Sequence, residues 1–391
     1  MPFFAKNGYE HIPPGLVLLF INILDSIPLL SSIWRKVIPF GWADPPNGLF
    51  SYHVPALSFP PLKTYSEVPG GIIDFLSASD TVLGDISHPF TFFVVIIIAK
   101  AIHSFKFSIY PTFQKFAKKI AAQTHGEQWT RDNPERIYKF GEYCFRLIFH
   151  SSISLYGLYV FANNDWWHPK NGGTMNFYQN FPNHELKPDA IWYGLLEAGY
   201  NLDAMVSIIV MSFVIKVDMK QFPFVTIGWA DSVRGDFNEM FLHHIVTNFL
   251  VIGGSSCRLS RAQQCFFIIH DISDVPIDIS KLSNFLKWKK TTVVCFISMM
   301  IIWAITRLTI LPFIVYRSII FESFLVLEEG SVGPEVFYCY RTFFVVLGGG
   351  IICLHVIWFG MFVKMVSLFF VKGEQHDLSE HKKGEKMSKK E

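Results

Sequence analysis

Long apolar segments recur along the chain and are separated by shorter polar ones. A helix needs about 20 apolar residues to cross roughly 30 Å of hydrocarbon. Seven segments are predicted to span a membrane in this way, at residues 88–110, 138–162, 190–215, 237–257, 259–270, 291–316 and 340–371. The fifth is shorter than the others. Residues 14–31 are also apolar, but Asp25 and Pro28 in their middle favour an interfacial helix.

Composition supports a membrane protein. Of the 391 residues, 51% are hydrophobic and only 17% are charged, which is too apolar for one or two soluble domains. We therefore predict an all-α polytopic membrane protein. The six cysteines form no CxxC pair and are predicted to be buried small hydrophobic residues.

Basic residues are distributed unevenly between the connections. Lys and Arg are held on the cytosolic side of membrane proteins. The connection after the first span, residues 111–137, is basic, as are residues 216–236, 280–290 and the tail 372–391. Residues 163–189 carry few positive charges and many aromatic side chains. The pattern predicts that the basic segments and the C-terminus are cytosolic and that residues 163–189 are lumenal.

Two polar pairs interrupt the fourth and fifth apolar segments. His243 and His244 begin one segment, His270 and Asp271 end the next, and the small polar run 253–258 between them suits a turn. If the chain folds back there, each arm is roughly 20 Å long, and the pairs meet at one depth near the cytosolic side. Polar groups at such a depth are costly, so they indicate a functional site.

These residue types suit acyl transfer. Burial disfavours imidazolium and a carboxylate restores basicity, so His243 or His244 beside Asp271 can be a neutral base or nucleophile. Asp274 lies one turn beyond His270. One alternative is that these are polar residues marking helix ends. Another is a di-iron site, but such sites use HxxxH and HxxHH boxes, which the chain lacks, so no metal is expected.

Arginines within the apolar segments are further candidates. Arg261 and Arg307 either anchor a carbonyl or carboxylate group in a cavity or form structural pairs with Glu197 or Asp203.

The second span contains another arginine. Glu142 and Arg146 are i, i+4 neighbours, and a helix-stabilising pair is expected ahead of a catalytic role.

The segment from residue 243 to residue 281 resembles the signature of the ceramide synthase family, the enzymatic branch of the TRAM-LAG-CLN8 (TLC) domain proteins. The matching residues are His243, His244, Thr247, Arg261, His270, Asp271, Ser273, Asp274 and Lys281. KFGEYCFRLIFH at 139–150, TRLTILP at 306–312 and LHVIWF at 354–359 are similar to other parts of the family pattern. The resemblance covers roughly residues 135–372.

The chain departs from that pattern at several positions. Arg258 stands where the family has Asn, Gln263 where it has Gly, Phe145 where it has Trp, and Asp278 where it has Glu. Pro276 is unusual and is expected to end or kink the fifth helix. These changes bear on substrate range and leave the polar cluster intact.

The resemblance implies an organisation for the whole chain. It comprises an N-terminal lumenal or interfacial region (1–87), a first transmembrane helix and cytosolic loop (88–134), a TLC catalytic domain (135–372) and a disordered basic tail (373–391). Six of the seven spans are expected to form a helical barrel that opens to the cytosol in the endoplasmic reticulum membrane.

The resemblance also implies a reaction, N-acylation of a sphingoid base by a fatty acyl-CoA to give (dihydro)ceramide. The expected catalytic residues are His243, His244, His270, Asp271 and Asp274. The expected binding residues are Arg146, Arg234, Arg261, Lys281 and Arg307. Acyl-CoA is a co-substrate and no other cofactor is expected. Membrane lipids are partners, nucleic acid is not, and a homo- or heterodimer is compatible with the family. A TLC protein that binds lipid or assists membrane insertion without catalysis is the alternative.

Overall fold

Helices make up nearly all of the described chain. The computed structural model describes residues 62–217, 225–229, 236–328 and 334–372, and two short strands before them. The long helices are α4 (Pro89–Thr124), α6 (Pro134–Ala162), α7 (Pro188–Ser212), α8 (Phe237–Ser256), α9 (Ser260–Phe285), α10 (Lys289–Ile305) and α13 (Pro334–Lys372). The short ones are α3 (Ile72–Ser77), α5 (Glu127–Asp132), α11 (Arg317–Phe321) and α12 (Leu325–Glu328), with 3-10 turns η1 (Tyr65–Glu67), η2 (Val82–Gly84), η3 (Pro169–Asn171), η4 (Gly173–Phe177) and η6 (Glu322–Phe324). Residues 14–31, Arg234 and the tail 373–391 lie outside the described residues.

Strands form two short antiparallel pairs. β1 (Glu10–His11) pairs with β2 (Leu57–Ser58). β3 (Phe213–Val217) follows α7 directly and pairs with β4 (Val225–Trp229). The second pair lies in the connection between the third and fourth predicted spans. The predicted helical class is confirmed, and the strands add only local structure to these connections.

Each predicted apolar segment is helical in the structure. Within the described residues, four candidate spans have the length and hydropathy of a membrane crossing, at Pro89–Thr124, Pro134–Ala162, Lys289–Leu327 and Phe337–Leu368. Large apolar side chains point outward from several long helices, including those of Leu155, Val294 and Phe313. Hydrocarbon, unlike water, solvates such faces without cost. The chain is therefore a multi-pass membrane protein.

The fifth helix is longer than predicted. α9 continues past His270 and Pro276 to Phe285, so Pro276 does not end it. Proline removes one backbone hydrogen bond from a helix. Here α9 packs against α6 and α10, and neighbouring helices often allow proline within a transmembrane helix.

The sixth helix is irregular in its second half. α10 passes without interruption into a π-helix, η5 (Thr306–Tyr316), and then into α11. Pro312 lies inside η5, and Arg307 near its start is buried. Because π-helical segments occur frequently at functional sites, η5 is expected to lie near such a site.

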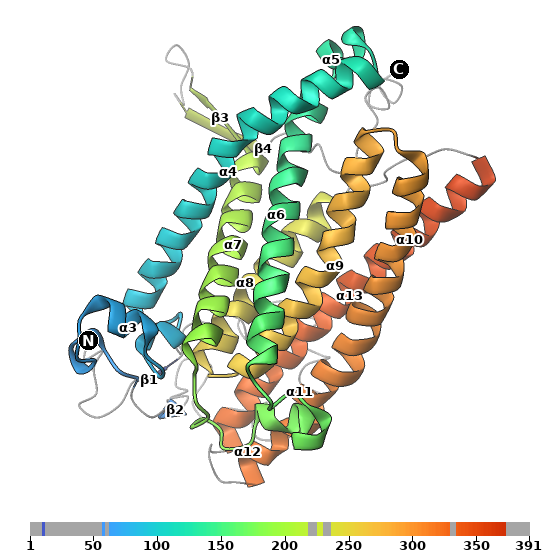
Figure 1. Ribbon diagram of the computed structural model, residues 1–391. Helices are drawn as coiled ribbons and strands as arrows, with labels where there is room; N and C mark the ends of the chain where they lie inside the picture. Colours follow the sequence, from blue (N-terminus) through green and yellow to red (C-terminus); the bar gives the residue numbers. More distant parts are fainter. Residues whose placement is uncertain are drawn as a thin grey trace.

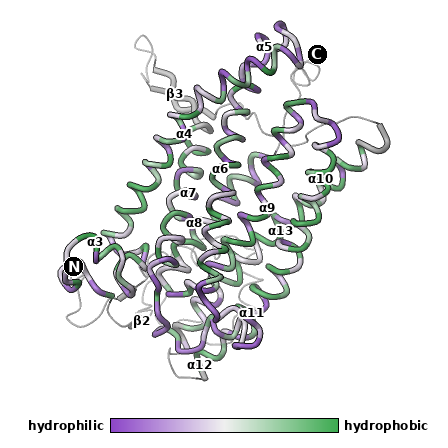
Figure 2. Tube along the Cα trace, in the orientation of Figure 1, coloured by the Kyte–Doolittle hydropathy of each residue, from purple (hydrophilic) through white to green (hydrophobic). Residues whose placement is uncertain are grey.

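The long helices run side by side, and their connections gather at two ends (Figure 1). α5, the β3–β4 pair and the turn between α9 and α10 lie at the first end. Residues 163–187, α11 and α12 lie at the second end. The described parts of the connections 111–137, 216–236 and 280–290, predicted to be cytosolic, therefore share the first end, and the connection 163–189, predicted to be lumenal, lies at the second. Figure 2 shows that the long helices are largely hydrophobic between these ends.

Each long helix packs against two or more of the other described helices. α4 packs against α6 and α7, α6 against α9, and α7 against α8. α8 packs against α13, α13 against η5, and α10 and η5 against α9. Side chains from α7, α8, α9, η5 and α13 thereby face a shared interior.

Residues 62–87 cover the second end of α7 and α8. The indole Nε1 of Trp192 donates to the carbonyl oxygen of Leu76 at 2.8 Å, and the backbone N–H of Ile86 donates to Ser255 Oγ at 2.9 Å. Phe75 and Leu83 are buried in the same apolar cluster. The interior is thus closed at this end by the segment that precedes the first long helix.

The turn between α8 and α9 contains a left-handed residue. Arg258 has a φ of 54°, which asparagine and glycine adopt more readily than arginine does. The turn lies at the predicted fold-back, although α8 itself includes Gly253 and Gly254. The asparagine that the family has at this position suits the left-handed backbone conformation. This chain has arginine there instead.

Gly199 marks a close approach of α7 to α4. A Cβ atom there would lie 2.5 Å from Cγ2 of Ile98 and 3.2 Å from the backbone nitrogen of Ala99. We expect Gly199→Ala to destabilise the protein by about 1–3 kcal/mol, because the helices must separate. Thermal unfolding of detergent-solubilised protein measures this.

Gly194, on the same helix, supplies the matched control. A Cβ atom at Gly194 would meet nothing within 4 Å. Gly194→Ala should therefore leave stability unchanged or raise it by up to about 1 kcal/mol through helix propensity. Equal effects of the two substitutions would contradict the close-approach explanation.

Candidate active site

Histidines from three helices meet in the interior. The ring of His355 on α13 lies 6.3 Å from the ring of His243 on α8 and 4.9 Å from that of His270 on α9, measured between centroids. His244 is adjacent, with its ring 5.6 Å from that of His243. The polar pairs thus lie at one level of the bundle, and His355 connects them.

Several ring nitrogens of His243, His270 and His355 are buried without a hydrogen-bond partner among the described residues. Among the described residues, no partner reaches Nδ1 of His243, Nε2 of His270 or either ring nitrogen of His355. Nδ1 of His270 lies 2.6 Å from the carbonyl oxygen of Phe266. Because a carbonyl can only accept, Nδ1 carries the proton, and Nε2 is the basic nitrogen of the neutral ring. Unsatisfied buried polar atoms are rare, so this cluster indicates a site for a reacting ligand.

Two tryptophans pack against the cluster. Trp303 of α10 packs edge-on against His355 at 5.4 Å, and Trp358 of α13 packs edge-on against His243 at 5.3 Å. The indole Nε1 of Trp303 also donates to the carbonyl oxygen of His355 at 3.3 Å. These large rings restrict the orientation of the imidazoles.

Arg307 ties the π-helix to α9. Its Nε donates to Ser273 Oγ at 2.6 Å and its NH2 donates to the carbonyl oxygen of His270 at 2.9 Å. The same NH2 forms an ion pair with Asp274, and the guanidinium lies 4.0 Å from the ring centroid of Trp303. The expected pairing of Arg307 with Glu197 or Asp203 is therefore wrong. The reason is that Arg307 faces α9, whereas both acids belong to α7.

Asp271 faces α7. The Tyr193 hydroxyl donates to its Oδ2 at 3.1 Å, and the carboxyl group of Glu197 lies within hydrogen-bonding reach of it. Glu197 is 2% exposed and also accepts from the Asn201 amide. Two carboxyl groups this close share a proton, because both cannot be ionised in a buried site. Asp271 and Asp274 therefore have different environments, although they are close in sequence.

A second buried network lies further along α9, toward the first end. Asp278 is fully buried and forms an ion pair with Arg146 at 3.2 Å. It also accepts from Nδ1 of His150 at 2.8 Å, and the Tyr200 hydroxyl lies 3.0 Å from Nε2 of the same ring. Arg146 was expected to pair with Glu142 along its own helix. The ion pair that the structure shows instead connects α6 to α9.

The remaining predicted binding residues are spread along the molecule. Lys281, near the first end of α9, places Nζ 5.1 Å from the ring centroid of Tyr143. Arg234 lies outside the described residues.

Arg261 lies near the second end, away from the histidines. It donates to the carbonyl oxygen of Asn176 at 2.7 Å and lies over the ring of Trp166. Burial, and secondly this guanidinium, lower the pKa of His184 in the same region to about 3. Of the two alternatives for Arg261, the pair with Glu197 or Asp203 is wrong, because its guanidinium contacts the connection between α6 and α7 instead.

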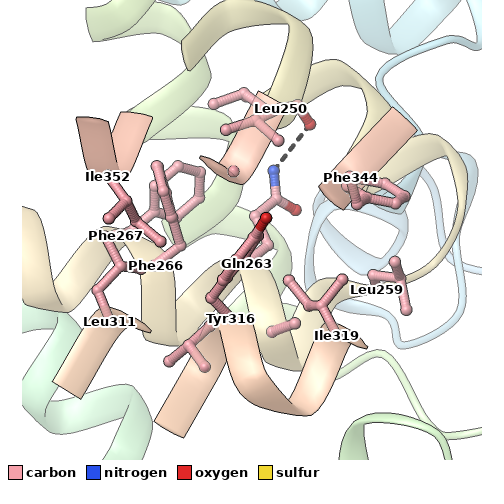
Figure 3. Close-up of a pocket in the computed structure, with 15 residues that line it drawn as sticks. Leu250, Leu259, Gln263, Phe266, Phe267, Leu311, Tyr316, Ile319, Phe344 and Ile352 are labelled. Carbon is pink, nitrogen blue, oxygen red and sulfur yellow. Dashed lines mark hydrogen bonds between the residues drawn. The ribbon is translucent and has the colours of Figure 1, made fainter. Parts of the chain in front are cut away.

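An apolar cavity of about 50 Å³ adjoins the histidine cluster. It is lined from α8 by Leu250, Val251 and Gly254, from the start of α9 by Leu259, Ala262, Gln263, Phe266 and Phe267, from η5 and α11 by Leu311, Val315, Tyr316 and Ile319, and from α13 by Phe344, Gly348 and Ile352. Phe266 precedes His270 by one turn, and Ile352 precedes His355 by about one turn. The cavity therefore extends from the cluster toward the second end (Figure 3).

His355, His150 and Glu197 were not assigned to the site by sequence reasoning. His355 lies in LHVIWF and His150 ends KFGEYCFRLIFH, two segments noted only for their similarity to the family pattern. Their polarity within apolar segments was the available signal. Among the described residues, no group of three or more His, Cys, Asp and Glu side chains has an arrangement that could hold a metal ion.

Comparisons with known proteins agree with the resemblance. A sequence profile of the TLC domain matches residues 139–364, more than half of the 391-residue chain. Ceramide synthase 4 of Bos taurus is 26% identical over 62% of this chain and 54% of its own length. Ceramide synthase LOH1 of Arabidopsis thaliana is 24% identical over 60% of this chain and 70% of its own length, and ceramide synthase hyl-2 of Caenorhabditis elegans is 20% identical over 64% and 70%.

The match covers only part of the mammalian relative, little more than half of its length. The profile match nevertheless includes the histidine cluster, the Arg307–Asp274 pair and the cavity. On this evidence, the chain belongs to the TLC domain family.

Proposed function

We propose that the protein is a ceramide synthase, which transfers a fatty acyl group from acyl-CoA to the amine of a sphingoid base. The observation that carries this proposal is the histidine cluster beside an apolar cavity, in which buried ring nitrogens of His243, His270 and His355 have no hydrogen-bond partner among the described residues. A thioester at the cluster would place its acyl chain in the cavity. The names of the relatives support the same reaction.

The first chemical step is attack on the thioester. A nitrogen of His243 forms a bond to the carbonyl carbon while the carbon–sulfur bond breaks, and the CoA thiolate leaves and takes up a proton. The sphingoid amine then attacks the acyl-imidazole. The amide bond forms and the bond to His243 breaks, and the amine proton passes through a neighbouring imidazole such as His270 or His244 to the released nitrogen of His243, which regenerates the neutral ring. Direct base catalysis by His243, without the covalent intermediate, is the other route to the same products.

The carboxyl groups have separate roles in this proposal. Asp274 is paired with Arg307, which holds α9 against the π-helix. Asp271 and Glu197 together carry a negative charge near the site, and that charge suits the ammonium group of a sphingoid base. Arg307 also leaves a cationic surface near the site, which is suited to a carbonyl oxygen that gains negative charge.

The proposed topology follows the same logic. We propose seven membrane spans, six of which form a TLC-type barrel whose first end faces the cytosol in the endoplasmic reticulum. Lys281, Lys289 and Lys290 lie at that end and, with Arg234, would attract polyanionic CoA. The packing of neighbouring helices and the grouping of basic connections at one end support this arrangement.

An assay of membranes that express the chain tests the proposal. We expect formation of N-acylated product from a labelled sphingoid base and a panel of acyl-CoAs of different chain lengths. The same assay without acyl-CoA should give none. Absence of product with every acyl-CoA and every sphingoid base would favour a TLC protein that binds lipid without catalysis.

A further inference from the structure

The Gln263 side chain lines the apolar cavity and lies against α8. Figure 3 shows Phe266, Leu311 and Ile352 on one side of it, and Leu259 and Ile319 on the other. Phe266 and Ile352 each lie about one turn from a histidine of the cluster, and Leu311 lies one turn after Arg307. Leu259 and Ile319 lie toward the second end of the bundle. Gln263 therefore lines the cavity between the residues nearest the histidines and those toward the second end.

The side chain is held in this position. Its Nε2 donates to the carbonyl oxygen of Val251 at 2.8 Å. A Cβ atom added to Gly254 would lie 3.4 Å from Cδ of Gln263, so the glutamine lies directly across that glycine. The side chain is fixed at its end by this hydrogen bond and at its base by the α9 backbone. Moving it aside would therefore break the hydrogen bond.

We propose that Gln263 limits the length of the acyl chain that this protein accepts. This inference rests on the proposed function, because it assumes that the acyl chain lies in the cavity with its carbonyl group at the histidines. A chain that reaches Gln263 meets an anchored polar side chain. Longer chains must displace it or bend, and either option leaves methylene groups poorly packed. Gln263 is thus a specificity-determining residue.

The test is substitution of Gln263 by a smaller residue, Gln263→Ala, which retains high helix propensity. We expect the ratio of N-acylation rates for longer over shorter acyl-CoAs to rise by about tenfold for two added methylene groups, because each buried methylene favours binding several-fold. Rates are compared at subsaturating acyl-CoA with one fixed sphingoid base. An unchanged ratio would overturn the proposal.

Two further variants separate cavity volume from other effects. Gln263→Met retains the side-chain length but lacks the hydrogen bond to Val251, so its chain-length ratio should rise less than that of Gln263→Ala. Gln264→Ala makes the same truncation at the next residue, which is buried but does not line the cavity, and it should leave the ratio unchanged. If either variant shifts the ratio as Gln263→Ala does, the volume explanation is wrong.

A binding measurement keeps the inference testable if the proposed reaction fails. Purified wild-type and Gln263→Ala proteins are each titrated with a fluorescent fatty acid, which unlabelled fatty acids of graded length then displace. We expect the variant to favour longer chains by the same factor, whether or not the wild type acylates an amine. Identical displacement series for the two proteins would contradict the inference, while an inactive wild type with shifted binding would contradict only the proposed reaction.

Discussion

Replacement of His243 by alanine is expected to lower the rate of N-acylation by about 10²–10⁴-fold, the range that a positioned acid–base or nucleophilic group contributes. His243 packs against His355 and Trp358, and its buried Nδ1 has no hydrogen-bond partner among the described residues. Initial rates with a labelled sphingoid base measure the effect. Incubation with acyl-CoA alone, followed by mass spectrometry of the intact protein, shows whether an acyl group becomes attached.

His168→Ala is the matched control for this experiment. His168 lies in the connection before η3, at the second end of the bundle, and the same truncation there should leave the rate unchanged. A His243→Ala protein that is folded and retains the wild-type rate would exclude His243 from catalysis. Loss of activity, with acylated protein still detected, would move the nucleophile to another histidine.

Replacement of Arg307 by methionine is expected to destabilise the protein by about 3–5 kcal/mol, the usual cost of leaving one member of a buried ion pair unpaired. Arg307 is 4% exposed and is held by Ser273 and Asp274. Its removal also uncovers the face of Trp303, on which the guanidinium lies. Thermal unfolding in detergent should show a clearly lowered midpoint, with activity lost at temperatures that the wild type tolerates.

The double variant Arg307→Met with Asp274→Asn tests the cause of that loss. If the unpaired carboxylate dominates, the second substitution removes the charge and recovers most of the stability, and the two changes are strongly non-additive. Additive losses would instead assign the effect to packing on Trp303. A single Arg307→Met variant as stable as the wild type would contradict the structural role of the pair.

The two aspartates of α9 illustrate how neighbouring residues acquire different tasks. Asp271 faces Tyr193 and Glu197 on α7, and Asp274 faces Arg307 on the π-helix. Their separation by three residues rotates the second side chain by about 60° around the helix. Sequence reasoning grouped them as one catalytic set. The structure shows one beside a second carboxyl group and the other in an ion pair between helices.

Helices and their order follow closely from the sequence. Apolar length predicted α4, α6, α7, α8, α10 and α13 to within a few residues at most boundaries. The error at α9 arose from a local rule, because Pro276 disfavours a helix in isolation but is tolerated where α6 and α10 pack around it. Charge distribution likewise predicted which connections lie together at each end of the bundle.

The sequence by itself determined that this chain crosses a membrane, where its helices lie, and that His243, His244, His270 and Asp271 lie at one level. These three properties depend only on local composition and on distance along a helix. Neighbouring residues in the sequence determine composition and distance. Only the tertiary structure decided which side chains meet there. His355 reaches His243 across more than a hundred residues of sequence, and Asp278 pairs with Arg146 on a helix distant in the chain. The reason is that helix rotation depends on the packing of all neighbours at once, and no single segment carries that information.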